Sequence, residues 1–104
     1  MISENDNPAT ENRAIVRPEG DVVAAFVPEL RSRLLDLVRA GARQLVLDLS
    51  NVQMVDSLGL GLLISAHNSL LKVGGKLSVV HASADVLDLF KTMRLHQHFS
   101  VSGN

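Results

Sequence analysis

Apolar residues recur along the chain in short blocks, and their spacing alternates between that of strands and that of helices. The segment AIVRPEGDVV combines a short apolar run with Pro18 and then Gly20-Asp21, which predicts an edge strand that bends into a turn. From about Ala25 to Ala40, apolar residues recur at helical spacing, with Pro28 tolerated in the first turn and Gly41 as the stop. The helical positions are Leu30, Leu34, Leu37 and Val38.

The second half of the chain continues this alternation. RQLVLDL is almost continuously apolar, which is typical of a strand covered on both faces. After the loop SNVQMV, the stretch VDSLGLGLL begins a predicted helix that runs to about Val73 and ends at Gly74-Gly75. KLSVVH predicts a strand, Ser83 an N-cap, and HFSV a last short strand. The helix after Ser83 starts with Asp85 in its first turn and packs through Val86, Leu89, Phe90 and Met93.

Strands that alternate with helices define the fold class. The order predicts an α/β domain with right-handed crossovers and a small mixed, mainly parallel sheet of about four strands, covered by about three helices. In such sheets, functional residues tend to lie in loops that leave the carboxyl ends of the strands. VDSLG, Val55 to Gly59, occupies that kind of loop. We therefore expect the functional site there.

A helical wheel assigns the residues of this motif to faces. With Asp56 as N-cap and about 100° of rotation per residue, one side of the helix faces solvent and the other faces the sheet. Leu58 and Leu62 would then form an exposed apolar spot suited to a partner, unless a neighbouring helix covers them. Ser57 lies nearer the core side, where a first-turn serine bonds to local backbone. The sheet side holds Leu60, Leu63, Ile64, His67 and Leu71, and the solvent side holds Leu58, Leu62, Ser65 and Ser69.

Composition narrows the class of protein. The 104 residues suffice for one domain, predicted over residues 14–104, after a flexible polar tail over residues 1–13. The chain has no Cys, which excludes disulfides and thiolate metal sites. A net charge of −1 gives no sign of the basic surface that binds nucleic acid or an anionic membrane. No apolar run reaches the roughly 20 residues that span a bilayer, so we expect a soluble cytoplasmic protein.

No catalytic, cofactor or metal motif is complete. Val55 stands where a nucleophile elbow needs glycine, and GLGLLI lacks the last dinucleotide-binding glycine. His96 and His98 would share one face of a strand, but no third ligand lies nearby in sequence. His67 is expected in the core with one satisfied nitrogen, and Asp48 bonded to nearby loop amides. The sequence therefore predicts no enzyme, no cofactor and no metal.

Three stretches resemble STAS domains, and among them most closely the bacterial anti-sigma factor antagonists. These are LVLDLSNVQMVDSLGLGLL, GGKLSVV and SADVLDLFKTMRL, within a resemblance that covers about Ala14 to Val101. The resemblance implies a STAS-like fold and a role in transcription regulation by partner switching. Such proteins bind an anti-sigma factor that is also a serine kinase, and so free the sigma factor. The kinase phosphorylates the antagonist at the start of this helix, which breaks the complex, and a serine phosphatase restores it.

The resemblance fails at the residue on which the switch depends. The family motif has Ser or Thr directly before the glycine, and here that residue is Leu58. Partner binding carries over by resemblance to Asp21, Asp56, Leu58, Gly59 and Leu60, and the wheel adds Leu62. Ser57, at the start of the same helix, is also expected among the partner-binding residues. Ser57 is the alternative phospho-acceptor. The final helix of many members is also missing after HFSV, so we expect one covering layer to be thinner or to come from another subunit.

Two other functions remain open from the sequence. The same fold serves as a subunit or scaffold in lipid-transport or larger signalling complexes, where the Leu58 and Leu62 spot would be a permanent contact. The loops around Asp21 and Asp56 could instead form a small-ligand sensor, although the sequence names no ligand.

Overall fold

The computed structural model describes residues 13–103, and strands alternate with helices along them. The predicted tail over residues 1–13 lies outside the described part, except for Arg13, which begins β1. The elements are β1 (Arg13–Val16), α1 (Val27–Arg39), β2 (Gln44–Asp48), α2 (Ser57–Lys72), β3 (Lys76–Ala82), α3 (Ala84–Thr92), the 3₁₀ helix η3 (Leu95–Gln97) and β4 (Ser100–Gly103).

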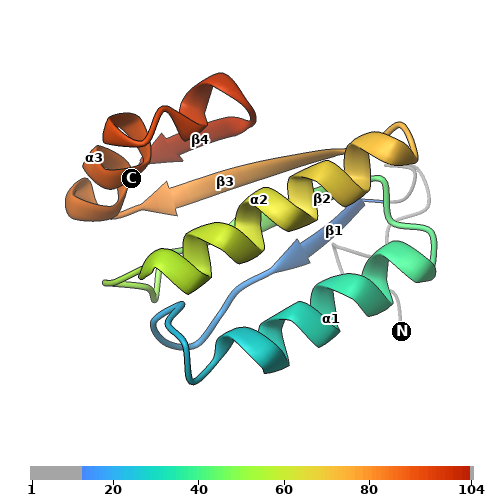
Figure 1. The fold of residues 1–104 in the computed structure, drawn as a ribbon, viewed down its shortest axis with the longest axis horizontal. Helices are drawn as coiled ribbons and strands as arrows, with labels where there is room; N and C mark the ends of the chain where they lie inside the picture. Colours follow the sequence, from blue (N-terminus) through green and yellow to red (C-terminus); the bar gives the residue numbers. More distant parts are fainter. Residues whose placement is uncertain (1–12, 104) are drawn as a thin grey trace.

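The four strands form one sheet in the order β1-β2-β3-β4, and every described pairing is parallel. Consecutive parallel strands with right-handed crossovers place the connecting helices on the same face. α1 and α2 lie side by side over that face (Figure 1). The rings of His67 in α2 and Phe90 in α3 both contact Phe99, so the third helix belongs to the same layer. The predicted α/β fold class is confirmed.

Alternation along the strands separates the core from the other face of the sheet. The register rows Leu45–Leu77 and Leu47–Val79 are buried under the helices. Val46 and its partner Ser78 point to the opposite face and are half-buried. RQLVLDL was expected to be covered on both faces, but within residues 13–103 helices cover only one of them.

The buried face of α2 differs from the one that the wheel predicts. Leu60, Leu63 and His67 are buried as expected, but Ile64 and Leu71, assigned to the sheet, are 39% and 55% exposed. Leu62, assigned to solvent, is 3% exposed, because α1 packs beside α2 and covers it. The sheet below α2 and α1 beside it together bury a wide arc of the α2 surface. The centre of this arc differs from the predicted centre by less than the roughly 100° between successive residues.

Local signals set the ends of the helices correctly. Gly41 after α1 and Gly74 after α2 have φ of 109° and 77°, the left-handed conformation that favours glycine. Ser83 caps α3 by accepting a hydrogen bond from the Val86 N–H at 3.2 Å. No helix among the described residues is long and apolar enough to cross a membrane.

The histidines near the carboxyl terminus are arranged differently from the sequence prediction. His96 lies in η3 and His98 is its C-cap, so the two share no strand face; the strand begins only at Ser100. His67 is in the core as predicted, 8% exposed, but its Nδ1 has no hydrogen-bond partner among the described residues.

Candidate functional site

The loops that follow β1 and β2 lie together at the carboxyl edge of the sheet, where α2 begins. The Val22 N–H donates to the Met54 carbonyl at 3.0 Å, and the Asp56 N–H donates to the Val22 carbonyl at 3.2 Å. These bonds form an isolated parallel bridge between Val22 and Val55. The start of α2 is therefore fastened to a loop more than thirty residues away in sequence.

Two aspartates, one in each loop, strengthen this connection by accepting hydrogen bonds from the other loop. Asp21, in the first loop, accepts from the Gln53 and Met54 N–H groups of the second at 2.9 and 3.1 Å. Asp56, in the second loop, accepts from the Ala24 N–H of the first at 2.9 Å through its other oxygen while it caps α2 at Gly59, 2.8 Å away. The predicted N-cap is thus confirmed. Bonds from the Gly59 and then the Ala24 N–H lower the pKa of Asp56 below its ordinary value.

Gly59 allows the close approach of helix and loop. A Cβ on Gly59 would collide with the Val22 carbonyl oxygen and lie 3.0 Å from a methyl carbon of Val22 and of Val55. Gly61, two residues further along α2, has no atom within 4 Å of a Cβ added there. The first glycine of GLG is therefore required by packing, and the second is not.

The two loops that these hydrogen bonds join present an apolar surface around the first turn of α2. Leu58 is 57% exposed and Met54 is 58% exposed, whereas Leu60 is buried below them. Ser57 is exposed at the first helical position, and its hydroxyl makes no hydrogen bond within residues 13–103. Its predicted position near the core, bonded to local backbone, is wrong because the buried arc of α2 is displaced. Leu62 is buried, so the exposed spot consists of Leu58 with Met54, and not of Leu58 with Leu62.

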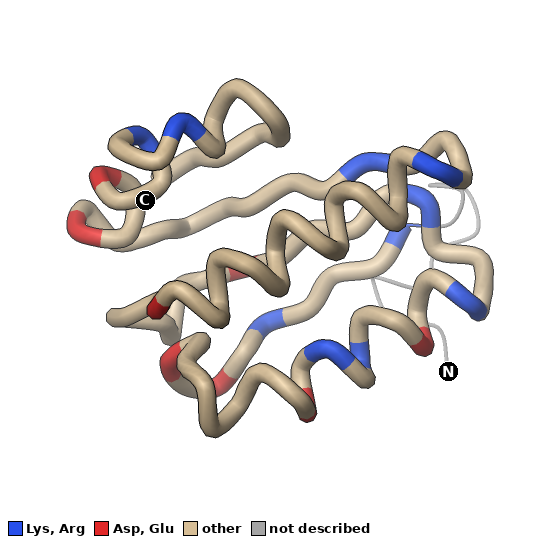
Figure 2. Tube along the Cα trace, in the orientation of Figure 1, with Lys and Arg blue, Asp and Glu red and all other residues tan. Residues whose placement is uncertain are grey.

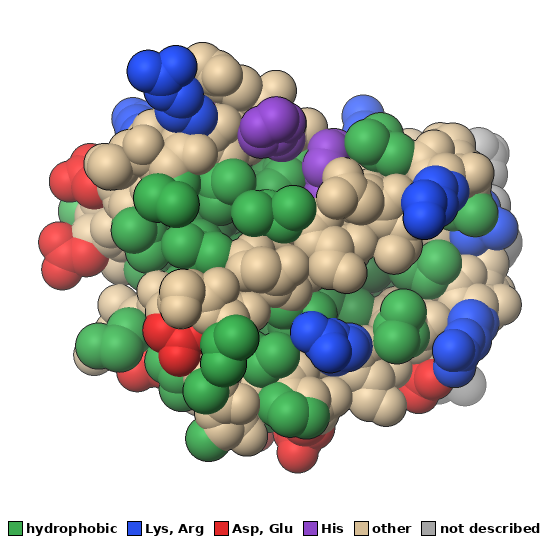
Figure 3. All heavy atoms as spheres, viewed as in Figure 1, with side chains coloured by type: hydrophobic (Ala, Val, Ile, Leu, Met, Phe, Trp, Pro, Cys, Tyr) green, Lys and Arg blue, Asp and Glu red, His purple; other side chains and the backbone are tan. Residues whose placement is uncertain are grey.

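A shallow hollow of about 250 Å³ continues this surface toward α3. It is lined by Met54, Val55, Val86 and Leu89, with Asp85 at its edge. Hydrophobic side chains gather between α2 and α3 on this face (Figure 3). Several acidic residues lie at the end of the molecule where α2 begins, and several Lys and Arg residues lie toward the opposite end (Figure 2). The surface is apolar at its centre, with the carboxylate of Asp85 beside it.

Asp48 forms a charged cluster at the same edge of the sheet. It is 4% exposed, pairs with Arg17 at 3.2 Å and His81 Nδ1 at 3.2 Å, and accepts from the Ser50 N–H at 2.9 Å. Burial alone would raise its pKa, but bonds from Ser50 and His81 and the Arg17 charge outweigh burial and lower it to about 2. The sequence predicted the loop-amide bond but not Arg17 or His81.

The described residues offer no metal site: no group of three or more His, Cys, Asp or Glu among them is placed to hold an ion. The arrangement at the start of α2 consists of fixed backbone amides, engaged carboxylates and exposed apolar side chains. Such a surface is suited to binding a partner.

The chain belongs to the STAS domain family, whose model matches residues 5–104. It is similar to the anti-sigma-B factor antagonist of Bacillus subtilis strain 168, with 30% identity over 101 residues, 97% of this chain and 87% of that protein. This similarity extends over the site as well as the core.

Solved structures share the fold at lower identity. A candidate anti-sigma factor antagonist from Thermotoga maritima matches with a TM-score of 0.81 and 18% identity, over 100% of this chain and 84% of that one. Unphosphorylated SpoIIAA, an anti-sigma factor antagonist, matches with a TM-score of 0.73 and 20% identity, over 84% of this chain and 76% of that one. The murine anion transporter Solute Carrier 26 family member A9 matches with a TM-score of 0.71 and 22% identity, over 100% of this chain and 20% of that one. These matches show a common fold.

Proposed function

We propose that this protein is an anti-sigma factor antagonist of the cytoplasm, and that it binds an anti-sigma factor of the serine-kinase type so that the sigma factor is released. The observation that carries the proposal is the rigidly held, exposed pair Leu58 and Met54 at the start of α2. The 30% identity to the anti-sigma-B factor antagonist supports the same conclusion.

The surface favours a particular kind of partner face. Leu58 and Met54 are each more than half exposed to solvent. A partner with apolar side chains at its centre would cover them. The hollow beside Met54 has room for one such side chain. Asp85, which lines that hollow, favours a basic residue at the facing position of the partner, which would speed association at low salt.

Regulation by phosphate is expected to differ from that of the family motif. Leu58 has no hydroxyl, so the residue before Gly59 cannot accept a phosphoryl group. Ser57 has an exposed hydroxyl at the positive end of α2, which tolerates the added charge of about −1.5 to −2. We propose Ser57 as the acceptor if the protein is switched at all; without phosphorylation there, the antagonist would always be competent to bind.

Reconstitution with the anti-sigma kinase encoded in the same genome and its sigma factor tests this function. The antagonist should displace the sigma factor from the kinase, as followed by size-exclusion chromatography. Intact mass after incubation with ATP reports phosphorylation, and Ser57→Ala controls for the site. Failure to bind the kinase contradicts the proposed function, and a phosphate on Ser57 contradicts the constitutive version only.

A second function is favoured by one comparison. The whole chain superposes on about a fifth of an anion transporter, so this fold also occurs as a module of a large membrane protein. In that case the Leu58 surface would be a permanent contact within a transport or signalling assembly. Purification of the tagged protein from its own cells separates the two, because a transporter component in the eluate favours the assembly and a kinase favours the antagonist.

A further inference from the structure

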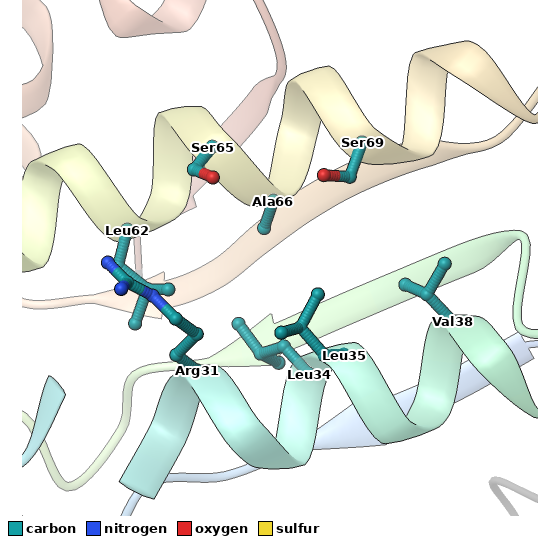
Figure 4. A pocket seen from close by; sticks show the side chains of 8 residues that line it. All are labelled: Arg31, Leu34, Leu35, Val38, Leu62, Ser65, Ala66 and Ser69. Carbon is teal, nitrogen blue, oxygen red and sulfur yellow. The ribbon is translucent and has the colours of Figure 1, made fainter. Parts of the chain in front are cut away.

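A groove of about 300 Å³ lies between α1 and α2, away from the carboxyl edge of the sheet. Leu34, Leu35 and Val38 rise from α1, and Leu62 and Ala66 face them from α2 (Figure 4). Such a volume is at the lower end of the range for small-molecule sites, which combine apolar walls with few polar groups. This groove has walls of that kind.

One end of the groove is charged. Arg31 extends from α1 toward α2 beside Leu62 (Figure 4), and it is the only charged residue that lines the groove among those described. Its guanidinium makes no ion pair or hydrogen bond within residues 13–103, so it is available to an anion. The hydroxyls of Ser65 and Ser69 lie along the α2 side, where they can donate to an oxygen.

The shape of the groove favours a single linear chain over a helix. Val38 is seven positions after Arg31 on α1, so the groove runs about 10 Å along the helix axis. A volume of about 300 Å³ spread over that length leaves a narrow groove between the two helices. A helix with side chains is roughly 10–12 Å across, so it would lie over this groove and not within it. An acyl chain is narrow enough to lie within it.

We propose that this groove binds a linear amphipathic carboxylate, with its acyl chain along Leu34, Leu35 and Val38 and its carboxylate at Arg31. A guanidinium matches a carboxylate in charge and in planar geometry. The site goes beyond the proposed function, and it uses neither Leu58 nor the carboxyl-edge loops.

Titration of the full chain with decanoate, below its micelle concentration, tests the site by calorimetry. We expect saturable binding that weakens about fivefold in Arg31→Gln, because the ion pair is partly solvated. Decanol, which keeps the tail and lacks the charge, should bind about fivefold more weakly to the wild type. Each additional methylene of a carboxylate series should tighten binding about twofold to fourfold until the groove is filled.

Two variants test the location. Ser65→Leu, an exposed position on the α2 side, should abolish decanoate binding by filling the groove. Arg33→Gln, an exposed position on the same helix outside the groove lining, is the matched control and should bind like the wild type. Far-ultraviolet circular dichroism and melting temperature verify that each variant is folded.

The proposal is overturned if decanoate does not saturate, if decanol binds equally well, or if Arg33→Gln is as damaging as Arg31→Gln. It is also overturned if folded Ser65→Leu binds decanoate normally. A protein that occupies the groove would give yet another result, namely loss of kinase binding in Ser65→Leu without any binding of decanoate, and this too contradicts the carboxylate site.

Discussion

Replacement of Gly59 by alanine tests how the site is built. The added methyl group would collide with the Val22 carbonyl oxygen, which accepts the hydrogen bond from the Asp56 N–H. The start of α2 must therefore move away from the loop, or the loop must move away from α2. Both movements separate the elements that hold Leu58 and Met54 in place.

The expected change in the free energy of unfolding combines one stabilising and two destabilising contributions. Alanine in place of glycine stabilises a helix by up to about 1 kcal/mol, and by less in the first turn. Overpacking against backbone costs about 1–3 kcal/mol, and a weakened hydrogen bond costs about 0.5–1.5 kcal/mol. The free energy of unfolding should therefore fall by about 1–3 kcal/mol, which corresponds to a melting temperature roughly 5–15 °C lower.

Gly61→Ala is the matched control, because the same methyl group meets no atom within 4 Å on the same helix. It should raise the free energy of unfolding by about 0.5–1 kcal/mol. Urea unfolding followed by circular dichroism measures both variants. The packing argument is refuted if Gly59→Ala is as stable as the wild type, or if the two substitutions change stability in the same direction.

Two further predictions concern Asp48 and Leu58. The pKa of Asp48 is about 2 in the folded protein and about 3.9 in the unfolded chain. Asp48 therefore contributes about 2 kcal/mol to the free energy of unfolding above pH 4, and this contribution is lost as the pH falls toward 2. Asp48→Asn should accordingly be less stable at pH 7 in urea unfolding, and a stability difference that persists unchanged to pH 2 would contradict this. Leu58→Ser should gain one phosphate from the anti-sigma kinase and ATP by intact mass, also when combined with Ser57→Ala; an unmodified protein that still binds the kinase would refute transfer to this position.

Local patterns sufficed where neighbours in sequence determine the structure. The N-cap at Asp56, the glycine stops after two helices and the capping serine of α3 depend on residues within one turn. The order of strands and helices likewise follows from hydrophobic spacing, because parallel strands need crossover helices.

The errors arose where distant elements meet. The wheel placed Leu62 in solvent because nothing in α2 itself indicates that α1 packs beside it. The bonds from Asp21 to the second loop and from Asp56 back to Ala24 join residues more than thirty positions apart. Arg17 and His81 join Asp48 in the same way, through the register of three adjacent strands. No local pattern contains such pairings.

The central claim is that the start of α2 is the surface that binds the anti-sigma factor, and a charge on Leu58 tests it most directly. Leu58 and Leu71 are 57% and 55% exposed on the same helix, at opposite ends, so Leu58→Glu and Leu71→Glu make equal chemical changes in different places. Both variants should stay folded. Calorimetric titration with the anti-sigma kinase should show binding abolished by Leu58→Glu and unchanged by Leu71→Glu. Equal affinity in the two variants, whether retained or lost, would contradict the account.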